Sequence, residues 1–423
     1  MLDLRSIRED PEPARAALRR RGAAEQLDEL LRLDERRREM LPEVEEGRAR
    51  RNRVSDQIAQ LKREGKDADG PIAEMRELGG RLKEQEAELA TVEEARNELA
   101  ATLPNFPDPD APEGEPDEDA VTLREVGERR EFDFAIRDHL DIGVANGWIE
   151  MEKAAEASGS RFAYLMGDLV MVEVVLVRLV LELLQAEGMK PVVPPVLVRE
   201  GPLYGTGFFP GEREMIYEVP KDELFLVGTS EVSLAALHAG DILAAGELPI
   251  RYAGYSTCFR REAGAAGRDT RGIFRVHQFD KVEMFSFVEP SASREEHERL
   301  LAIQERILEL LDLPYRVVDI PTGDLGPPAA RKFDCEAWIP SEERYREVTS
   351  CSNTTDYQAR RLDCRYRPEP EAQPLPVHTL NGTALAVGRT LIALIENGQQ
   401  ADGSVVLPAA LVDAGLPQAI GGR

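Results

Sequence analysis

The sequence predicts an α+β protein with two parts: an antiparallel helical coiled-coil arm at the N-terminus, and a C-terminal domain built on a mostly antiparallel sheet flanked by helices. Two observations lead to this prediction. Apolar residues recur at alternating steps of three and four along much of the first hundred residues. Beyond residue 130, β-rich runs follow one another, several of them across short loops. We expect the arm at 1–103, a linker at 104–130 and the sheet domain at 131–423.

The arm is predicted as a helical hairpin over residues 27–103. Its apolar rows are Leu33, Met40, Gly47, Val54 and Leu61, then Leu30, Arg37, Val44, Arg51 and Ile58, and in the second helix Leu78, Leu82, Leu89, Val92, Leu99 and Leu103. The segment EGKDADGP, with Gly65, Gly70 and Pro71, breaks the helix between them. Such a hairpin is either a dimerisation or spacer coil or a lever that grips a large partner.

Basic residues near the far half of the hairpin could meet the phosphates of such a partner. They are Arg48, Arg50, Arg51, Arg53, Lys62 and Arg63. On a solvated helix, runs of this kind are usually unremarkable. The pattern therefore leaves both interpretations of the arm open.

The linker begins with PNFPDPDAPEGEPDEDA, residues 104–120. It holds five prolines and seven carboxylates and no basic residue. Such a composition cannot build a core, so it marks a domain boundary.

The sheet domain is predicted from alternating apolar and polar runs. The expected strands are PIRYAGYSTCF, FRVHQFDKVEMFSF, YRVVDI, FDCEAWIP and, after a short polar turn at 341–344, REVTSCS. Helices near 166–187, 293–311 and 385–396 would cover the sheet.

Composition excludes several classes of protein. A net charge of -26 argues against a globally basic nucleic-acid binder, although a local basic path remains possible. The four cysteines, Cys258, Cys335, Cys351 and Cys364, form no C-x-x-C pair, so we expect reduced thiols and no zinc. The start lacks an apolar signal core. The most apolar segment carries Asp168, Glu173, Arg178 and Glu182, so we expect a cytoplasmic protein without a membrane span.

The most basic stretch is CFRREAGAAGRDTRGIFRVHQFDKVEM, residues 258–284. It is predicted as a hairpin with a glycine-rich loop, in which Arg260 and Glu262 share one face of a strand and Arg261 takes the other. Guanidinium groups suit phosphate oxygens, and the carboxylate of Glu283 on the returning strand suits an ammonium group or a hydroxyl. Taken alone, the stretch could equally be a surface hairpin held by ion pairs.

Three other segments point to the same chemistry. GTSE ends at Glu231 after an apolar strand, and YREVTSCSN carries Glu347 and Ser350, oxygen ligands that could hold Mg²⁺. HTLNGTALAVGRTL supplies Thr383 and then a helix bearing Arg389. A second arginine delivered from a helix fits the other end of a polyphosphate, so we expect Arg260 and Arg389 to face one cavity.

These segments resemble the motifs of class II aminoacyl-tRNA synthetases, in the form typical of bacterial seryl-tRNA synthetases. Residues 258–284 resemble motif 2, GMKPVVPPVLV resembles motif 1, and LNGTALAVGRTLIALIENGQQADG resembles motif 3. The resemblance extends to GTSE, SRFAYLMGDL, LYGTGFFP and the helical arm, and so covers nearly the whole chain.

The resemblance implies serine–tRNA ligation with ATP and Mg²⁺, through seryl-adenylate and pyrophosphate. The partners it implies are tRNA(Ser), held by the arm, tRNA(Sec) where present, and a second copy of the chain through motif 1. The implied serine pocket is Thr229, Ser230, Glu231, Glu283 and Thr383. The implied ATP site is Arg260, Arg261, Glu262, Val276, Glu347, Val348, Thr349, Ser350 and Arg389, with Arg260 and Arg389 catalytic and Glu347 and Ser350 on the metal.

Three rival functions deserve comparison. A catalytically dead scaffold would not need Arg260, Glu262, Glu283, Glu347 and Arg389, all of which are present. An amino acid:carrier-protein ligase of similar fold would lack the arm. A duplicate synthetase that resists a serine-mimicking antibiotic would keep every one of these features.

Overall fold

The computed structural model describes residues 2–115, 119–263, 269 and 271–422. It divides into two compact units, one formed by residues Leu2–Leu103 and the other by residues Pro104–Arg423. Each is described by itself below.

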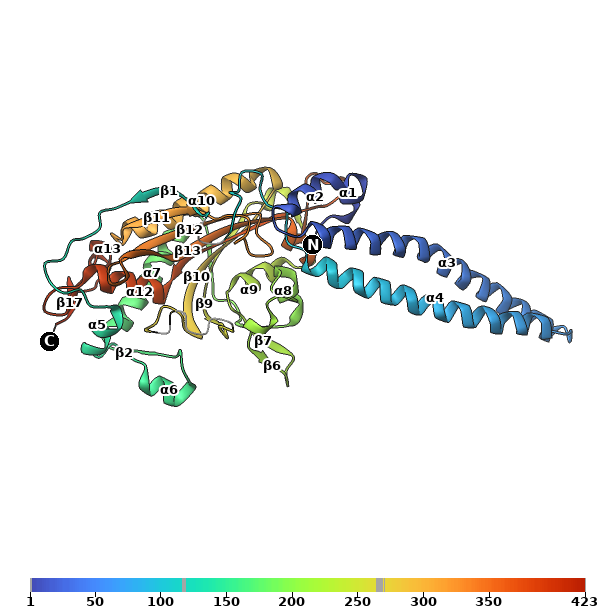
Figure 1. Cartoon of the computed structure of the whole chain (residues 1–423), viewed down its shortest axis with the longest axis horizontal. Helices are drawn as coiled ribbons and strands as arrows, with labels where there is room; N and C mark the ends of the chain where they lie inside the picture. The colour runs from blue at the N-terminus through green and yellow to red at the C-terminus, as the bar shows by residue number, and fades with distance from the viewer. Residues whose placement is uncertain (1, 116–118, 264–268, 270, 423) are drawn as a thin grey trace. The chain divides into compact units, whose positions relative to one another are not determined.

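The N-terminal unit is all-helical. Its helices are α1 (Leu4–Glu9), α2 (Pro11–Arg19), α3 (Ala24–Arg63) and α4 (Asp69–Thr102). Helices α3 and α4 form the antiparallel hairpin in Figure 1. Its seam buries Met40, Val44, Leu82 and Leu89. A Cβ on Gly47 would lie 3.0 Å from Leu82 Cδ1, so this glycine in the apolar row allows the helices to approach.

The break between the two helices is shorter than the sequence suggests. It spans residues 64–68, with Gly65 at φ +67°. Gly70 and Pro71 lie inside the first turn of α4. Proline is tolerated there because the first amides of a helix have no intrahelical partner. Pro42 is unusual because it lies inside α3, where a proline removes a hydrogen bond of the helix.

The segment expected as a linker is more ordered than its composition suggests. The Asn105 side-chain amide donates to the carbonyls of Pro328 and Thr354, at 2.9 and 2.8 Å, and Ala111 is buried. Residues Val121–Val126 form strand β1, which pairs with β11 at the edge of the main sheet. Residues 104–115 and 119–130 therefore belong to the C-terminal unit and are held by side-chain bonds to backbone carbonyls and by strand pairing, which composition does not report.

The C-terminal unit is built on an eight-stranded sheet. In spatial order its strands are β1 (Val121–Val126), β11 (Tyr315–Asp319), β12 (Arg331–Ile339), β13 (Arg344–Thr355), β16 (His378–Ala386), β10 (Gln278–Val288), β9 (Ile250–Phe259) and β4 (Lys190–Val192). All neighbours are antiparallel except β4 and β9. The mostly antiparallel sheet is confirmed.

Shorter elements surround this sheet. The helices are α5 (His139–Ala145), α6 (Glu152–Ser158), α7 (Asp168–Ala186), α8 (Glu200–Thr206), α9 (Glu231–Ala235), α10 (Ser293–Leu310), α11 (Tyr357–Leu362), α12 (Val387–Gly398) and α13 (Ala409–Asp413). The small strands are β2 (Ile149–Glu150), β3 (Tyr164–Leu165), β5 (Leu197–Val198), β6 (Glu218–Val219), β7 (Leu224–Leu226), β8 (Ile242–Ala244), β14 (Arg365–Arg367), β15 (Leu375–Pro376), β17 (Ser404–Val406) and β18 (Ala419–Gly421).

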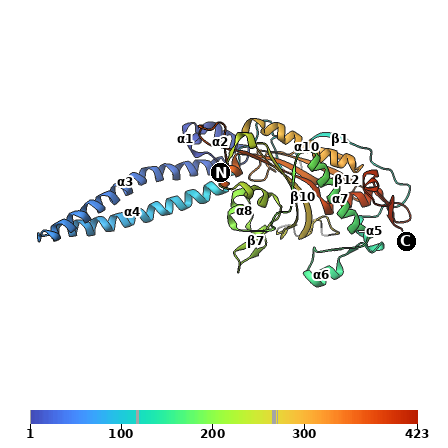
Figure 2. The ribbon, with the colours of Figure 1, turned by 180° about the vertical axis from the view of Figure 1, so that it is seen from behind.

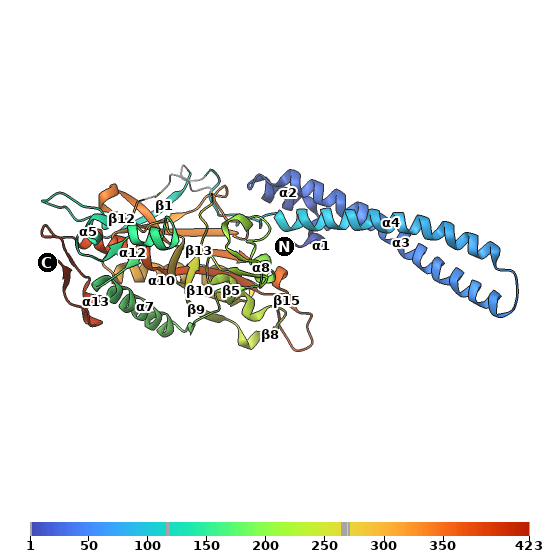
Figure 3. The ribbon, with the colours of Figure 1, turned by 90° about the horizontal axis from the view of Figure 1, so that it is seen from below.

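Helices α7, α10 and α12 contribute to one hydrophobic core on one face of the sheet. This core joins Leu176, Leu300 and Leu391 of the helices to Val282 and Met284 of β10. Figure 2 shows α10 running along the strands, and Figure 3 shows α7 beside α13. Because strand residues alternate, the neighbours of Val282 and Met284 point to the opposite face. That face is free to carry polar groups.

None of the helices in the described ranges combines the length and apolar character that crossing a bilayer requires.

Candidate active site

A cavity opens on the polar face of the sheet. Most of the site residues that the sequence predicts line it: Thr229, Glu231, Arg260, Glu262, Val276, Glu283, Glu347, Val348, Ser350, Thr383 and Arg389. They come from β10, β13, β16, α9, α12, the turn before α9 and the segments that follow β9 and precede β10, so the fold gathers segments up to 160 residues apart. Arg260 and Arg389 share this one cavity, as the sequence predicts.

Three predicted residues do not line the cavity. Ser230 is fully buried, and its hydroxyl donates to the Gly254 carbonyl at 3.4 Å. Arg261 is exposed. Thr349 is buried at an irregularity of β13. Their side chains lie apart from the cavity because each neighbours a residue that enters it.

The basic hairpin differs from the prediction at its ends. Strand β9 ends at Phe259 and β10 begins at Gln278, so Arg260–Glu262 and 273–277 extend beyond the paired strands. One backbone bond continues the pairing, from Arg260 N to the His277 carbonyl at 2.9 Å. Glu262 has φ +50°, which turns the chain out of the strand. Loop residues 264–268 and 270, where we predict the glycine-rich turn, lie outside the described residues.

One end of the cavity is acidic. Glu283 Oε2 lies 2.6 Å from Lys281 Nζ and accepts from the Thr383 hydroxyl at 3.1 Å. Lys281 also donates to the Thr229 hydroxyl at 2.7 Å. The charge of Glu283 is therefore balanced by a fixed cation, although the carboxylate is buried.

Glu231, the second carboxylate at this end, has no such cation. Its described hydrogen-bond partners are amides: Gln358 Nε2 at 2.7 Å and Asn381 Nδ2 at 3.2 Å. Burial, with repulsion from Glu283, raises the pKa of Glu231 to about 7. A cationic ligand placed against Glu231 would relieve this penalty.

The other end of the cavity is basic. Arg260 donates through Nε to the Gly228 carbonyl at 3.2 Å and lies over the Phe279 ring. Arg389 lies over the Phe274 ring, 4.7 Å from its centroid, and its Nη1 is 3.1 Å from Glu347 Oε1. These guanidinium groups are partly exposed to the cavity, so they can meet an incoming anion.

An ion pair fixes the segment between the two ends. Glu262 Oε2 lies 2.7 Å from Arg275 Nη1, and the Glu262 side chain is almost fully buried. The pair joins the segment that follows β9 to the segment that precedes β10. It therefore holds the carbonyl and amide groups near Val276 against the cavity.

A β-bulge places Glu347 and Ser350 on the same face of β13. Residues three apart in a regular strand point to opposite faces. Here Glu336 pairs with Glu347 while Cys335 pairs with Thr349, so Val348 is an extra residue. Glu347 and Ser350 consequently both line the cavity.

The Glu347–Ser350 pair is chemically suited to a hard cation. Partial desolvation opposes the ionisation of Glu347, whose side chain is 42% exposed, but the cations around it, Arg389 foremost, outweigh that penalty and lower its pKa to about 2. Within the described ranges, no group of three or more His, Cys, Asp or Glu side chains forms a metal-binding cluster. A Mg²⁺ here would need further oxygens from phosphates and water, which is how proteins commonly hold it.

Several lining residues escaped the sequence analysis, among them Lys281, Asn381 and Phe274. Lys281 lies two residues before Glu283, and Asn381 lies two before Thr383. Strand alternation alone could have found both. Gln358, which holds Glu231 from α11, has no comparable local signal.

Comparison with known proteins gives one consistent result. Residues 1–107 match the family model of the seryl-tRNA synthetase N-terminal domain, and residues 216–398 match that of the tRNA synthetase class II core domain (G, H, P, S and T). The serine–tRNA ligase of Acidothermus cellulolyticus is 50% identical over 414 residues, which cover 98% of this chain and 97% of that protein.

Solved structures agree with this result. The seryl-tRNA synthetase of Pyrococcus horikoshii, complexed with ATP, superposes with a TM-score of 0.88 at 39% identity, covering 100% of this chain and 99% of that one. The cytoplasmic serine–tRNA ligase of Naegleria fowleri, in complex with AMP, gives 0.83 at 32% identity, covering 97% and 96%.

Proposed function

The chain belongs to the seryl-tRNA synthetase family, and we propose from this premise how its cavity divides the substrates of serine–tRNA ligation. The single observation that supports the division is the separation of charge within one cavity. Glu231 and Glu283 are both bonded to Asn381 at one end, whereas at the other end Arg389 pairs with Glu347 and Arg260 lies near the same carboxylate. Serine would occupy the acidic end and the phosphates of ATP the basic end.

The two carboxylates suit different groups of serine. Glu231 carries a buried charge without a fixed cation, so it would take the serine ammonium. Glu283 is already neutralised by Lys281, so with Thr383 it would read the hydroxyl. A pocket that must hydrogen-bond a hydroxyl rejects the analogue without one by about 10⁴-fold, which would exclude alanine.

The chemical step needs positioning and charge neutralisation more than proton transfer. The serine carboxylate, already ionised, attacks the α-phosphorus in line, the bond to the β-phosphate oxygen breaks, and pyrophosphate leaves with the electron pair. Arg260 would hold the α-phosphate and Arg389 the terminal phosphates. For this, the Arg389 guanidinium would exchange its contact with Glu347 for the triphosphate.

We propose that Glu347 and Ser350 hold Mg²⁺ once ATP supplies the remaining oxygens. The bound cation would neutralise charge on the phosphates. Glu347 is ionised at neutral pH, as a ligand of a hard cation must be.

The N-terminal unit would bind tRNA(Ser), and tRNA(Sec) where it is present. Arg51 and Arg53 on α3 are exposed, and among the described residues neither has a carboxylate partner. They are therefore available to phosphates, whereas Arg50 is paired with Glu74. The seryl-tRNA synthetase N-terminal domain that this unit matches supports the assignment.

A second copy of the chain would cover an apolar patch of the C-terminal unit. The patch comprises the exposed side chains Val170, Met171, Val174, Val193 and Leu197, from α7 and the motif 1 segment. Exposed apolar patches of this kind mark protein–protein contacts. We expect a homodimer by sedimentation equilibrium, and Val174→Asp to shift it toward monomer.

Pyrophosphate exchange with each of the twenty amino acids tests the activity and its specificity together. Exchange should depend on serine alone, and Glu283→Ala should abolish it. Near-normal serine-dependent exchange by Glu283→Ala would refute the serine subsite, and exchange driven best by another amino acid would refute the substrate assignment.

A further inference from the structure

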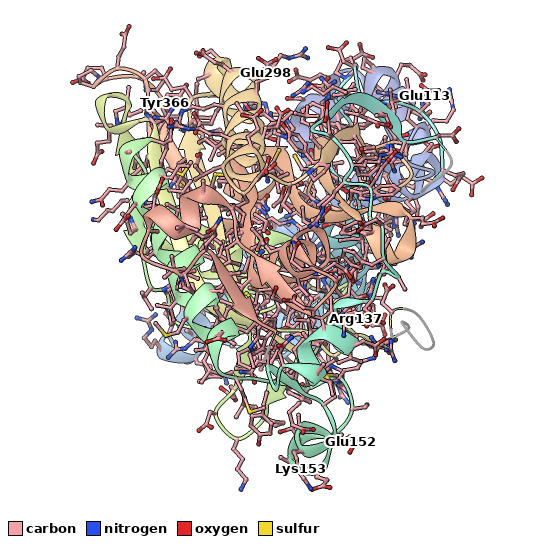
Figure 4. The ribbon with its side chains drawn as sticks, turned by 90° about the vertical axis from the view of Figure 1, so that its left-hand side faces the viewer. Glu113, Arg137, Glu152, Lys153, Glu298 and Tyr366 are labelled. Carbon is pink, nitrogen blue, oxygen red and sulfur yellow. The ribbon has the colours of Figure 1, made fainter. Side chains whose placement is uncertain are left out.

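His139 lies outside the cavity but contacts the ATP-binding hairpin. It begins α5, just after Arg137, which Figure 4 labels, and its side chain is buried. Its Nε2 accepts from the backbone N–H of Ile273 at 3.2 Å. Ile273 begins the stretch through Val276 that lines the cavity. One imidazole nitrogen is therefore bonded directly to the backbone of the proposed nucleotide site.

The other imidazole nitrogen is held by the helix that carries Arg389. His139 Nδ1 lies 3.1 Å from Glu396 Oε1, near the end of α12. The same carboxylate accepts from the backbone N–H of His139 at 3.0 Å, and its Oε2 accepts from Ser341 N at 3.0 Å. Glu396 is fully buried, so this contact is firmly fixed.

These two bonds together specify one tautomer. An amide N–H can only donate, so Nε2 must be unprotonated, and Nδ1 must carry the proton that Glu396 accepts. An imidazolium would lose the bond to Ile273. Neutral His139 with the proton on Nδ1 satisfies every partner.

The residues around His139 hold its ring against the returning end of the hairpin. Gly272 has φ +72°, and a Cβ there would lie 2.0 Å from His139 Nε2. Arg271 is anchored to α5 from outside, with Nε 2.5 Å from Asp138 Oδ2 and Nη2 2.5 Å from Asp141 Oδ1. The returning end of the hairpin is thus clamped at three consecutive residues.

We propose that His139 is a positioning residue for the adenylation reaction, which bridges the hairpin of Arg260 and the helix of Arg389 and fixes the backbone at Ile273. The inference rests on the proposed assignment of residues 273–276 to ATP. It predicts a selective effect: disturbing His139 should weaken ATP binding and leave serine binding intact, because Glu231 and Glu283 do not touch this network.

Two substitutions separate the bonds. The amide of His139→Gln can reach the position of Nε2 and accept from Ile273, whereas that of His139→Asn reaches only the position of Nδ1. In serine-dependent pyrophosphate exchange we expect His139→Asn to raise the KM for ATP about tenfold, the loss of one hydrogen bond, with the KM for serine unchanged. His139→Gln should stay within about threefold of the wild type.

The same assay separates this inference from the proposed site. Arg389→Ala, a residue of the site itself, serves as the control. If Arg389→Ala loses exchange while His139→Asn keeps its KM for ATP, the positioning role is wrong. Equal defects in Asn and Gln variants, or an equal rise in the KM for serine, would also overturn it. Normal exchange by Arg389→Ala would instead refute the proposed site.

The tautomer offers a test that does not depend on a variant folding. Long-range ¹H–¹⁵N spectra of the wild-type protein, labelled at histidine, should show His139 with a protonated Nδ1 and an unprotonated Nε2 at pH 8. A proton on Nε2 would contradict the bond to Ile273 and with it the proposal.

Discussion

The helical arm and the sheet unit use charge in contrasting ways. On the arm, ion pairs join α3 to α4, as in Arg48 with Glu86 and Arg50 with Glu74, and their side chains are about half exposed. In the sheet unit, carboxylates such as Glu231 and Glu283 are buried beside the cavity. Exposed pairs contribute about 0.2–1 kcal/mol each, whereas buried charges shift pKa values and favour ligands. The burial of a charged side chain, more than the number of charges in a region, therefore identifies the residues that bind substrates.

The strongest test of this contrast removes one region completely. Replacing residues 30–100 by a short linker should leave serine-dependent pyrophosphate exchange near normal, because none of the described residues that line the cavity belongs to the arm. Charging of tRNA(Ser) should fall below detection, measured by incorporation of labelled serine. Retained charging would reduce the arm to a spacer.

The next largest effect should come from the basic end of the cavity. Arg389→Ala should lower exchange about 10²-fold or more, the usual cost of losing one preorganised donor to a developing charge. Thermal unfolding should be little changed, since the side chain is partly exposed. A loss of less than threefold would show that Arg389 does not meet the phosphates.

The acidic end predicts a dependence on pH. With its pKa raised to about 7, Glu231 is ionised above that value and protonated below it. The KM for serine should therefore rise about tenfold per pH unit as the pH falls below 7, and stay level above it. In Glu231→Gln the KM should be high and independent of pH over this range. A flat wild-type profile from pH 8 to 5.5 would contradict the assignment of the ammonium.

The smallest effects should come from single changes on the arm. Reversing charge with Arg51→Glu and Arg53→Glu together should raise the KM for tRNA about tenfold at low salt, and less at higher salt, without altering exchange. Arg50→Ala is the matched control, because that guanidinium is paired with Glu74. If Arg50→Ala weakens tRNA binding as much as the double variant does, an exposed arginine without a carboxylate partner is not a sign of a phosphate contact.

Much of the fold could be predicted because both units repeat a simple period. The heptad rows indicate the helical hairpin, and alternation indicates β9, β10, β12 and β13, whereas β16 was not predicted as a strand. Strand β1 escaped because five of its six residues are exposed, so an edge strand shows no apolar alternation. Its backbone pairing with β11 is a tertiary contact, and the composition of the segment does not predict it.

The site could be predicted in part for a similar reason. Residues recognised by type and motif, such as Arg260 and Glu283, line the cavity, whereas Arg261 and Thr349, which the resemblance also implies, do not. Lys281 is visible by alternation, but Gln358 and His139 act across long sequence separations. Their roles depend on which helices pack together, and no local pattern fixes that.

Because Val348 is an extra residue in β13, the way this strand pairs with β12 decides whether Glu347 and Ser350 can bind one cation. If the four residues from Glu347 to Ser350 paired with β12 without the bulge, the two side chains would point to opposite faces, and one of the two oxygens would turn toward the hydrophobic layer where Val348 now packs. The strand could thus lose Val348 and still present both cation ligands on one face, two positions apart, whereas straightening the bulge at unchanged length would separate them without changing the amino-acid composition of the site.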